Sequence, residues 1–113
     1  MSTHYVDKLI AGAKIPGGET YWPEQPTGTF CAWGETIEAE GSDYCNEILR
    51  HDVEIELYEP MDHPNPEAHR RLQKAFNEEE LRWRKEPRIL DLQLRLLMTT
   101  YTFSYMERVD YEE

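Results

Sequence analysis

The sequence predicts an α+β fold: a two-layer sandwich in which a mostly antiparallel or mixed sheet of about four strands packs against one main helix, with a short helix at the N-terminus. Two observations support this prediction. Apolar and polar residues alternate over Ile48–Tyr58 and again over Thr99–Arg108, which is the period of strands with one buried face. Between them, Asn65 and Pro66 introduce a segment with helical periodicity. One helix between runs of strands is typical of a two-layer domain, and we expect residues 1–113 to form that single domain.

The N-terminal part should contain a short helix and the first strands. Apolar residues recur every three to four positions over Thr3–Ala13, and the proline and glycines of Ile15–Gly18 end that helix. Because prolines restrict a strand to a sheet edge, we expect a short edge strand at Thr20–Trp22. The first full strand is predicted at Thr29–Thr36. The polar segment Glu38–Asp43 is expected to form a turn or flap.

The segment Ile48–Tyr58 has the clearest strand pattern of the chain. The residues predicted to face inward are Val53, Ile55 and Leu57, and those predicted to face outward are Asp52, Glu54 and Glu56. Alternate residues on one strand lie about 6.5–7 Å apart, which suits acid–base chemistry or a hard cation. Surface acids are usually solvated, however, so we favour a solvated sheet face or the wall of an assembly.

The main helix is predicted from its N-terminal signals. Asn65 can cap it, Pro66 occupies the favoured first position, and Glu67 complements the helix dipole. The predicted apolar stripe consists of Ala68, Leu72, Ala75 and Phe76. The side chains predicted to face water are Arg70, Arg71, Gln73, Lys74 and Asn77. We also expect an ion pair between Glu67 and Arg71, worth about 0.2–0.5 kcal/mol.

The C-terminal part returns to a period of two. Leu81–Glu86 reads as a strand with Leu81 and Trp83 inward. Alternating leucines then run from Leu90 to a change of phase at Leu96-Leu97, which predicts a bulge in a long strand, although a helix over Leu90–Leu97 is an alternative. The β-branched and aromatic residues of Thr99–Arg108 favour a strand there.

The charge is strongly negative and unevenly distributed. The net charge of −11 argues against sequence-independent binding to nucleic acid or anionic lipid, because both need a positive field. Residues 1–60 carry 3 basic and 12 acidic residues, whereas residues 61–113 carry 9 and 11. This asymmetry is compatible with head-to-tail assembly of identical copies.

The two cysteines, Cys31 and Cys45, are expected to be reduced and buried, since the N-terminal segment lacks the apolar run of a signal peptide. For the same reason we expect a soluble, intracellular protein without a membrane anchor.

No pattern in the chain predicts an enzyme. Asp62, His63 and His69 are close in sequence but lack the HExxH spacing of a zinc site, and we expect His69 on the helix surface. The glycines after Pro16 are not followed by the Lys-Ser or Lys-Thr of a phosphate loop, and no G-x-S-x-G elbow is present. We therefore expect no catalytic residue, no metal and no cofactor.

A basic surface is predicted from the second half of the chain. Its members are Arg70, Arg71, Lys74, Arg82, Arg84, Lys85 and Arg88. In a chain this acidic, we expect that surface to meet an acidic surface of a neighbouring copy rather than phosphate. The tryptophans Trp22, Trp33 and Trp83 are expected to be core or interface anchors.

Four stretches of the chain form a recognisable series. They are the opening LIAGAKIPGG, the segment ETYWPEQPTGTFCAW, the strand-and-helix unit VEIELYEPMDHPNPEAHRRLQKAF and the closing run LRWRKEPRILDLQLRLLMTTYTFSY. With these features the chain, from about Tyr21 to Met106, resembles the tail terminator or tail-completion (head–tail joining, minor tail) proteins of long-tailed bacteriophages and prophages. Where relatives often carry an Ala-Asp-Asn or Ala-Asp-Gly turn, this chain has EGSDYCNEI.

This resemblance implies a non-enzymatic structural protein of the virion tail or neck, assembled in the host cytoplasm. Such proteins form a homo-hexameric ring, in some cases from free monomers, that contacts the tail tube protein and a head–tail connector protein. DNA passes through the lumen without specific recognition, and no membrane is involved. We expect Asp52, Glu54 and Glu56 either to line the lumen or to lie at the subunit interface.

Two other classes of function are open. An acidic inhibitor that mimics DNA and binds a host nucleic-acid-binding enzyme would be a stable monomer or dimer with a basic partner. A small metal-dependent enzyme would use the strand acids or the histidines, and a metal titration distinguishes it.

Overall fold

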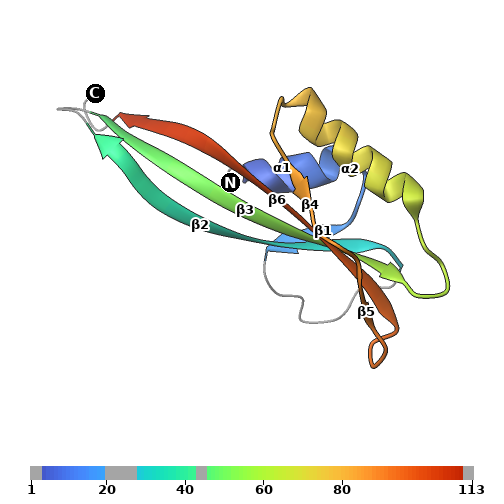
Figure 1. Cartoon of the computed structure of the whole chain (residues 1–113). Coiled ribbons are helices and arrows are strands. Elements are labelled where there is room, and N and C mark those ends of the chain that lie inside the picture. The colour runs from blue at the N-terminus through green and yellow to red at the C-terminus, as the bar shows by residue number, and fades with distance from the viewer. Residues whose placement is uncertain (1–3, 20–27, 43–45, 111–113) are drawn as a thin grey trace.

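The computed structural model describes residues 4–19, 28–42 and 46–110 (Figure 1). In chain order its elements are α1 (Tyr5–Gly12), β1 (Gly17–Glu19), β2 (Phe30–Ser42), β3 (Asn46–Pro60), α2 (Pro66–Glu78), β4 (Arg84–Lys85), β5 (Ile89–Asp91) and β6 (Leu96–Asp110). The strands form one mixed sheet in the order β1-β2-β3-β6-β4, with β5 beside β6. The predicted α+β class is confirmed, although the sheet has six strands rather than about four.

Both helices lie on one face of the sheet (Figure 1). The core between the layers contains the inward side chains of β3, which are Val53, Ile55 and Leu57, as predicted. Opposite them, α2 contributes Ala68, Leu72 and Phe76, while α1 contributes Val6, Leu9 and Ile10. Burying an aliphatic or aromatic side chain of this kind contributes about 1.5–3 kcal/mol, so this layer contact holds the helices to the sheet.

Strands β2, β3 and β6 extend well beyond the helices as a twisted three-stranded sheet (Figure 1). We call this extension the arm, consisting of residues 37–42 of β2, 46–50 of β3 and 106–110 of β6. None of the buried residues in the described part of the chain lies in the arm. The protein is consequently elongated, with a longest dimension of 54 Å.

The arm corrects one prediction. Glu38–Asp43 was expected to form a turn or flap, but β2 continues in register with β3 through Ser42, with an irregularity between Ala39 and Gly41. Arg50 on β3 stabilises this acidic strand, because its guanidinium contacts Glu40 at 3.0 Å and Glu38 at 3.9 Å. Asp43 lies outside the described residues.

The N-terminal helix forms as predicted, over Tyr5–Gly12. Lys14 then adopts a positive φ of 60°, which ends the helix and turns the chain toward β1. Gly17 is required there, because a Cβ at this position would lie 2.6 Å from Cγ2 of Ile10. The predicted edge strand Thr20–Trp22 lies outside the described residues. The described edge strand is β1, which pairs in parallel with residues 31–33 of β2.

Helix α2 has the predicted cap and a partly different surface. The side chain of Asn65 accepts the Ala68 N–H at 3.1 Å, and Pro66 is the first helical residue. The expected Glu67–Arg71 ion pair is replaced by one between Glu67 and Arg70. Arg71 instead donates from Nε to the Ala13 carbonyl at 2.8 Å and so ties α2 to the end of α1.

The C-terminal region contains a hairpin rather than a bulge. The strand predicted at Leu81–Glu86 is limited to Arg84–Lys85, although Leu81 and Trp83 do pack against the core. Residues 92–95 form a turn between β5 and β6, with Arg95 at φ 58°. This turn causes the change of phase at Leu96, and neither the predicted bulge nor the alternative helix is present.

No helix among the described residues is long and apolar enough to cross a membrane.

Candidate functional site

The predicted acidic residues lie on the sheet face opposite the helices, which we call the outer face. Asp52, Glu54 and Glu56 alternate with the buried residues of β3, the central strand of the sheet. Small residues flank them on both sides: Thr36, Gly34 and Ala32 on β2, and Ser104, Thr102 and Thr100 on β6. The acids therefore form a column down the middle of the outer face, between small residues of β2 and β6.

The three carboxylates differ in their surroundings. Asp52 accepts hydrogen bonds from Ser104 Oγ at 2.5 Å and from the Arg50 guanidinium at 3.0 Å, and both contacts lower its pKa. The pKa of Glu56 is raised by partial burial and by the neighbouring charge of Glu54. Asp52 thus shares the Arg50 cation with Glu38 and Glu40, whereas Glu56 lies beside the like charge of Glu54 and would gain from a cationic partner.

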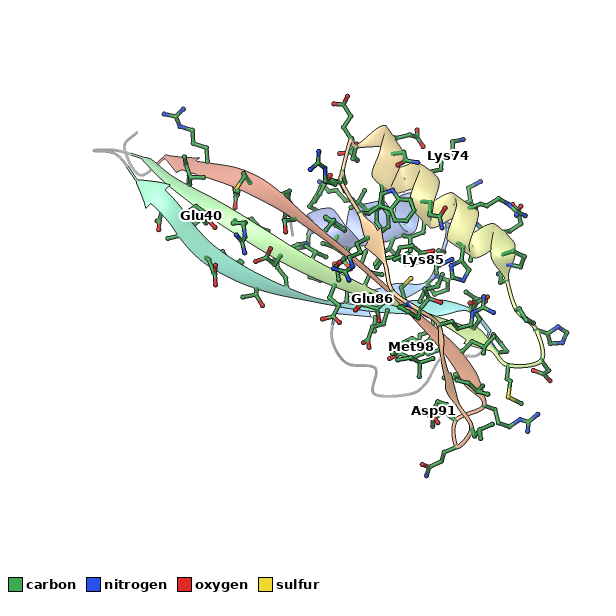
Figure 2. The ribbon with its side chains drawn as sticks, viewed as in Figure 1. Glu40, Lys74, Lys85, Glu86, Asp91 and Met98 are labelled. Carbon is green, nitrogen blue, oxygen red and sulfur yellow. The ribbon has the colours of Figure 1, made fainter. Side chains whose placement is uncertain are left out.

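The predicted basic residues do not form one surface. Arg70 and Lys74 are exposed on α2, and Lys74 projects from the outer side of that helix (Figure 2). Arg84 pairs in register with Thr102, which pairs with Glu54, so Arg84 lies on the outer face.

Arg82 and Arg84 line the same hollow of about 650 Å³ as Asp52 and Glu54. The structure therefore brings two of the predicted arginines to the predicted acids and leaves Arg70, Arg71 and Lys74 on the helical layer.

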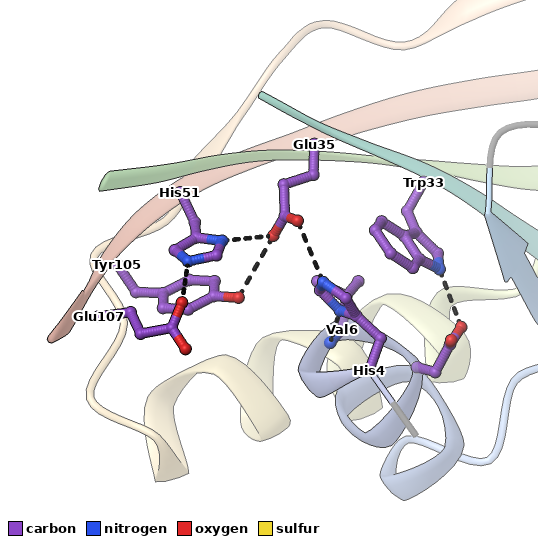
Figure 3. A network of polar contacts seen from close by, with 8 residues as sticks. His4, Val6, Trp33, Glu35, His51, Tyr105 and Glu107 are labelled. Carbon is purple, nitrogen blue, oxygen red and sulfur yellow. Dashed lines mark hydrogen bonds and ion pairs between the residues drawn. The ribbon is translucent and has the colours of Figure 1, made fainter. Parts of the chain in front are cut away.

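A polar network not predicted from the sequence joins α1 to the sheet where the arm begins (Figure 3). Its centre is Glu35 on β2. One oxygen of this carboxylate lies 3.1 Å from Nε2 of His4. The other lies 3.0 Å from Nδ1 of His51 and accepts the Tyr105 hydroxyl at 3.2 Å. On the other side of the His51 ring, Nε2 lies 2.8 Å from Oε1 of Glu107.

The hydrogen-bond pattern defines the proton positions in this network. Nδ1 of His4 accepts the Val6 N–H at 3.0 Å as the cap of α1, so Nε2 carries the proton that is donated to Glu35. Both nitrogens of His51 face carboxylates, which fits a protonated ring. Burial alone would lower the pKa of His51, but the bonds to Glu107 and Glu35 outweigh it and raise this pKa.

Glu35 shows the reciprocal effect. Burial favours the neutral acid, yet the bonds from His51 and His4 lower its pKa. Tyr105 stacks on the His51 ring, with centroids 4.4 Å apart, and burial beside Glu35 raises the pKa of its hydroxyl. The network thus holds a charged pair at the junction between the core and the arm.

A second network lies wholly inside the core and corrects the expectation for His69. This residue is 6% exposed rather than on the helix surface. Its Nε2 lies 2.7 Å from Oε1 of Glu59, and its Nδ1 lies 2.7 Å from the Tyr101 hydroxyl, which accepts a bond from Gln73. A hydrogen-bonded row of an acid, an imidazole and a hydroxyl is reminiscent of nucleophile activation, but the hydroxyl of Tyr101 is buried and bonded to both His69 and Gln73. We interpret this network as structural.

The surroundings of Cys31 and of the possible metal ligands can be described in turn. Cys31 is fully buried as predicted, and burial raises the pKa of its thiol to about 12, which makes it unreactive. Cys45 and Trp22 lie outside the described residues. Within the described ranges, no three His, Cys, Asp or Glu side chains are arranged to hold a metal ion, and His63 is exposed in the loop before α2.

Exposed apolar side chains gather at two ends of the molecule. The arm carries Ile37, Ile48 and Met106, and the β5–β6 hairpin carries Ile89, Leu90, Leu92 and Leu94. Leu92, at the hairpin turn, is 72% exposed. On the arm, Ile48 and Met106 lie on the outer face and Ile37 lies on the opposite face. Exposed apolar side chains that gather in one place, as on the hairpin, are typical of protein–protein contact surfaces.

Comparison of the sequence with models of known protein families gives no match, and comparison with curated protein sequences gives none either. The arrangement of the surface must therefore carry the functional argument.

Proposed function

We propose that this protein is a non-enzymatic structural subunit of a bacteriophage or prophage tail, a ring-forming tail terminator or head–tail joining component. In this role it caps the tail tube, docks the head, and belongs to the virion tail or neck. The observation that carries the proposal is the presence of exposed apolar groups at both ends of an elongated domain, on the arm and on the β5–β6 hairpin. A lone subunit gains nothing from exposing these groups, whereas a subunit with neighbours on both sides buries them.

The charge distribution is compatible with a ring. Identical copies related by rotation contact one another through two different patches, which must be complementary. The outer face offers Glu54 and Glu56, and α2 offers Arg70 and Lys74 on the opposite layer. These patches are separate on one copy and can therefore meet between copies, or the acidic column can face the lumen and repel DNA phosphate.

The outer face gives less support to the DNA-mimic alternative. A mimic needs a continuous field of negative charge. Here Arg50 forms an ion pair with Asp52, and Arg84 lies on the same face as Glu54. The acidic column is therefore interrupted by cations that would oppose a basic nucleic-acid-binding partner.

The proposal is tested by binding to isolated tail tubes. Tagged protein is incubated with tubes lacking their terminator, and bound protein is measured by sedimentation, together with the molar mass of the free protein by light scattering. We expect tube-end binding with a ring of subunits visible by electron microscopy. Binding to a host enzyme in place of tubes would contradict the proposal and favour the mimic.

Charge reversal locates the contact. In the variant Glu54→Lys/Glu56→Lys we expect defective ring formation or defective DNA passage, measured as phage titre. The matched control Glu78→Lys/Glu80→Lys makes the same charge change at two exposed acids near the end of α2. If both variants assemble and support the same titre, the acidic column has no role in the ring.

A further inference from the structure

Two strand edges of the sheet have no partner strand in the described part of the chain. Along the edge of β2 that faces away from β3, β1 pairs only with residues 31–33, so residues 34–39 are uncovered. Along the edge of β6 that faces away from β3, β5 pairs with residues 96–98 and β4 pairs with residues 101 and 102, so residues 103–107 are uncovered. These two edges flank β3 at the base of the arm and along it (Figure 1).

The backbone groups turned outward on β2 follow from the hydrogen-bond alternation of an antiparallel ladder. The Cys31 N–H donates to the Pro16 carbonyl at 2.8 Å, which is the direction away from β3. Every second residue of an antiparallel strand repeats this direction. The N–H and C=O groups of Glu35 and Ile37 therefore point to the uncovered side.

The same reasoning applies to β6. The Thr100 carbonyl accepts the Glu86 N–H at 2.9 Å, again away from β3. The N–H and C=O groups of Ser104 and Met106 consequently point outward. Each edge thus presents two consecutive outward positions, which is the repeat that a further strand would bind.

Both edges lack two of the features that usually prevent pairing, although they carry Glu35, Glu38 and Glu107 and β2 becomes irregular after Ala39. Residues 34–39 and 103–107 contain no proline and no lysine, and neither edge is covered by a described helix. Each edge instead exposes an apolar side chain at an outward position, because Ile37 is 51% and Met106 59% exposed. Long uncovered edges with such side chains are typical sites of strand addition.

We infer that the uncovered edge of β6 in one copy pairs with the uncovered edge of β2 in the next copy and so joins the sheets of neighbouring subunits. Strands β2 and β6 are both antiparallel to β3 and therefore run in the same direction. In copies related by rotation about one axis, β6 of one copy therefore pairs in parallel with β2 of the next copy. Each copy contacts one neighbour through its β2 edge and the other neighbour through its β6 edge. With Met106 opposite Thr36, the outer faces of the two sheets are continuous.

A second copy fits these edges better than a foreign extended peptide. A peptide would satisfy one edge and leave the other exposed, whereas repeated copies satisfy both with one contact. The contact is heterologous, so it propagates until it closes. This inference names the assembly surface of the proposed function and rests on its self-association, not on its binding to tail tubes.

Proline substitution tests the inference with little damage to the fold, because an outward N–H makes no bond within the sheet. We expect Ile37→Pro and Met106→Pro each to give folded monomers by light scattering at a concentration where the natural protein is assembled. The controls Ile37→Ala and Met106→Ala remove the side chains but keep the N–H groups, and should retain assembly.

Mixing the two proline variants provides the most specific test. Each retains one intact edge, and the two intact edges are complementary, so the mixture should form a 1:1 dimer and stop there. Absence of that dimer would overturn the pairing of β6 with β2. A natural protein that stays monomeric at its highest soluble concentration would overturn it as well, while tube binding would still test the proposed function separately.

Amide hydrogen exchange gives an answer even if a proline variant fails to fold. In the natural protein, the amides of Ile37 and Met106 should exchange freely when dilute and at least tenfold more slowly when assembled. Amide groups that point toward β3, such as that of Thr36, should be protected in both states. Equal exchange of Ile37 and Met106 in the two states would overturn the inference, as would proline variants that assemble normally.

Discussion

Replacement of Glu59 by glutamine should destabilise the protein strongly. Glu59 is fully buried, its Oε2 accepts the Asn65 N–H at 2.6 Å, and its Oε1 lies 2.7 Å from His69 Nε2 and 3.5 Å from Arg88. In Glu59→Gln, one of these donors faces an NH₂ group instead of an acceptor. An unpaired buried donor costs about 1–3 kcal/mol, and a hydrogen bond to a charged group contributes about 1.5–3 kcal/mol. We therefore expect a loss of about 3 kcal/mol in the free energy of unfolding.

Urea unfolding followed by tryptophan fluorescence measures this loss, since Trp33 is buried in the same core. Glu54→Gln is the matched control at an exposed position of the same strand and should change stability by less than about 0.5 kcal/mol. Tyr101→Phe breaks the other end of the network, so its effect should be less than additive with that of Glu59→Gln. If Glu59→Gln is as mild as the control, the buried network does not stabilise the fold and our reasoning is wrong.

Three further outcomes follow from single residues. Thr99→Val should raise the unfolding free energy by about 1 kcal/mol, because the Thr99 hydroxyl is buried and has no hydrogen-bond partner among the described residues; a lower thermal midpoint would contradict this. Asn65→Ala should cost about 1 kcal/mol through loss of the α2 cap, measured against Lys74→Ala as an exposed control on the same helix. Stability should be highest between about pH 4.5 and 6.5. The raised His51 pKa makes its contribution disappear as the pH rises through that pKa, and the lowered Glu35 pKa makes its contribution disappear at low pH. His51→Gln should flatten the alkaline side of a urea-midpoint profile, and an unchanged profile would refute that assignment.

The sequence was most informative where one physical constraint acts alone. A single buried face imposes a period of two, so the inward residues Val53, Ile55 and Leu57 and the outward acids of β3 were predicted correctly. The cap at Asn65 was equally accessible, because capping depends on residues within one turn. The acid positions on the outer face therefore needed no tertiary information.

Other features depend on contacts that a pattern does not identify. His51 and Glu59 have the same parity as the buried residues of β3, so their burial was visible in the alternation, but their partners His4, Glu107 and His69 come from distant elements. His69 itself lies three residues before Leu72 and seven before Phe76, which is the spacing of the buried helix face. The spacing was a usable signal, and polarity alone led to the surface assignment.

The hairpin turn at residues 92–95 could not be predicted from the hydrophobic pattern. Leu92 and Leu94 continue the alternation of β5 although both are exposed, so the turn is concealed by an apolar pattern. The turn depends on a local bond from the Leu94 N–H to the Asp91 side chain at 3.0 Å and on the positive φ of Arg95. Neither requirement changes the hydrophobic period.

The position of β6 has a consequence for biosynthesis. This strand leaves the ribosome after the other described strands, yet it lies beside β3 in the sheet and pairs residues as far apart as Asn46 and Asp110. Until it emerges, the apolar face of β3 has only one neighbouring strand and the buried His69 has no Tyr101. Pairings this distant in sequence form slowly, so the nascent chain exposes apolar surface during translation until synthesis passes Tyr101.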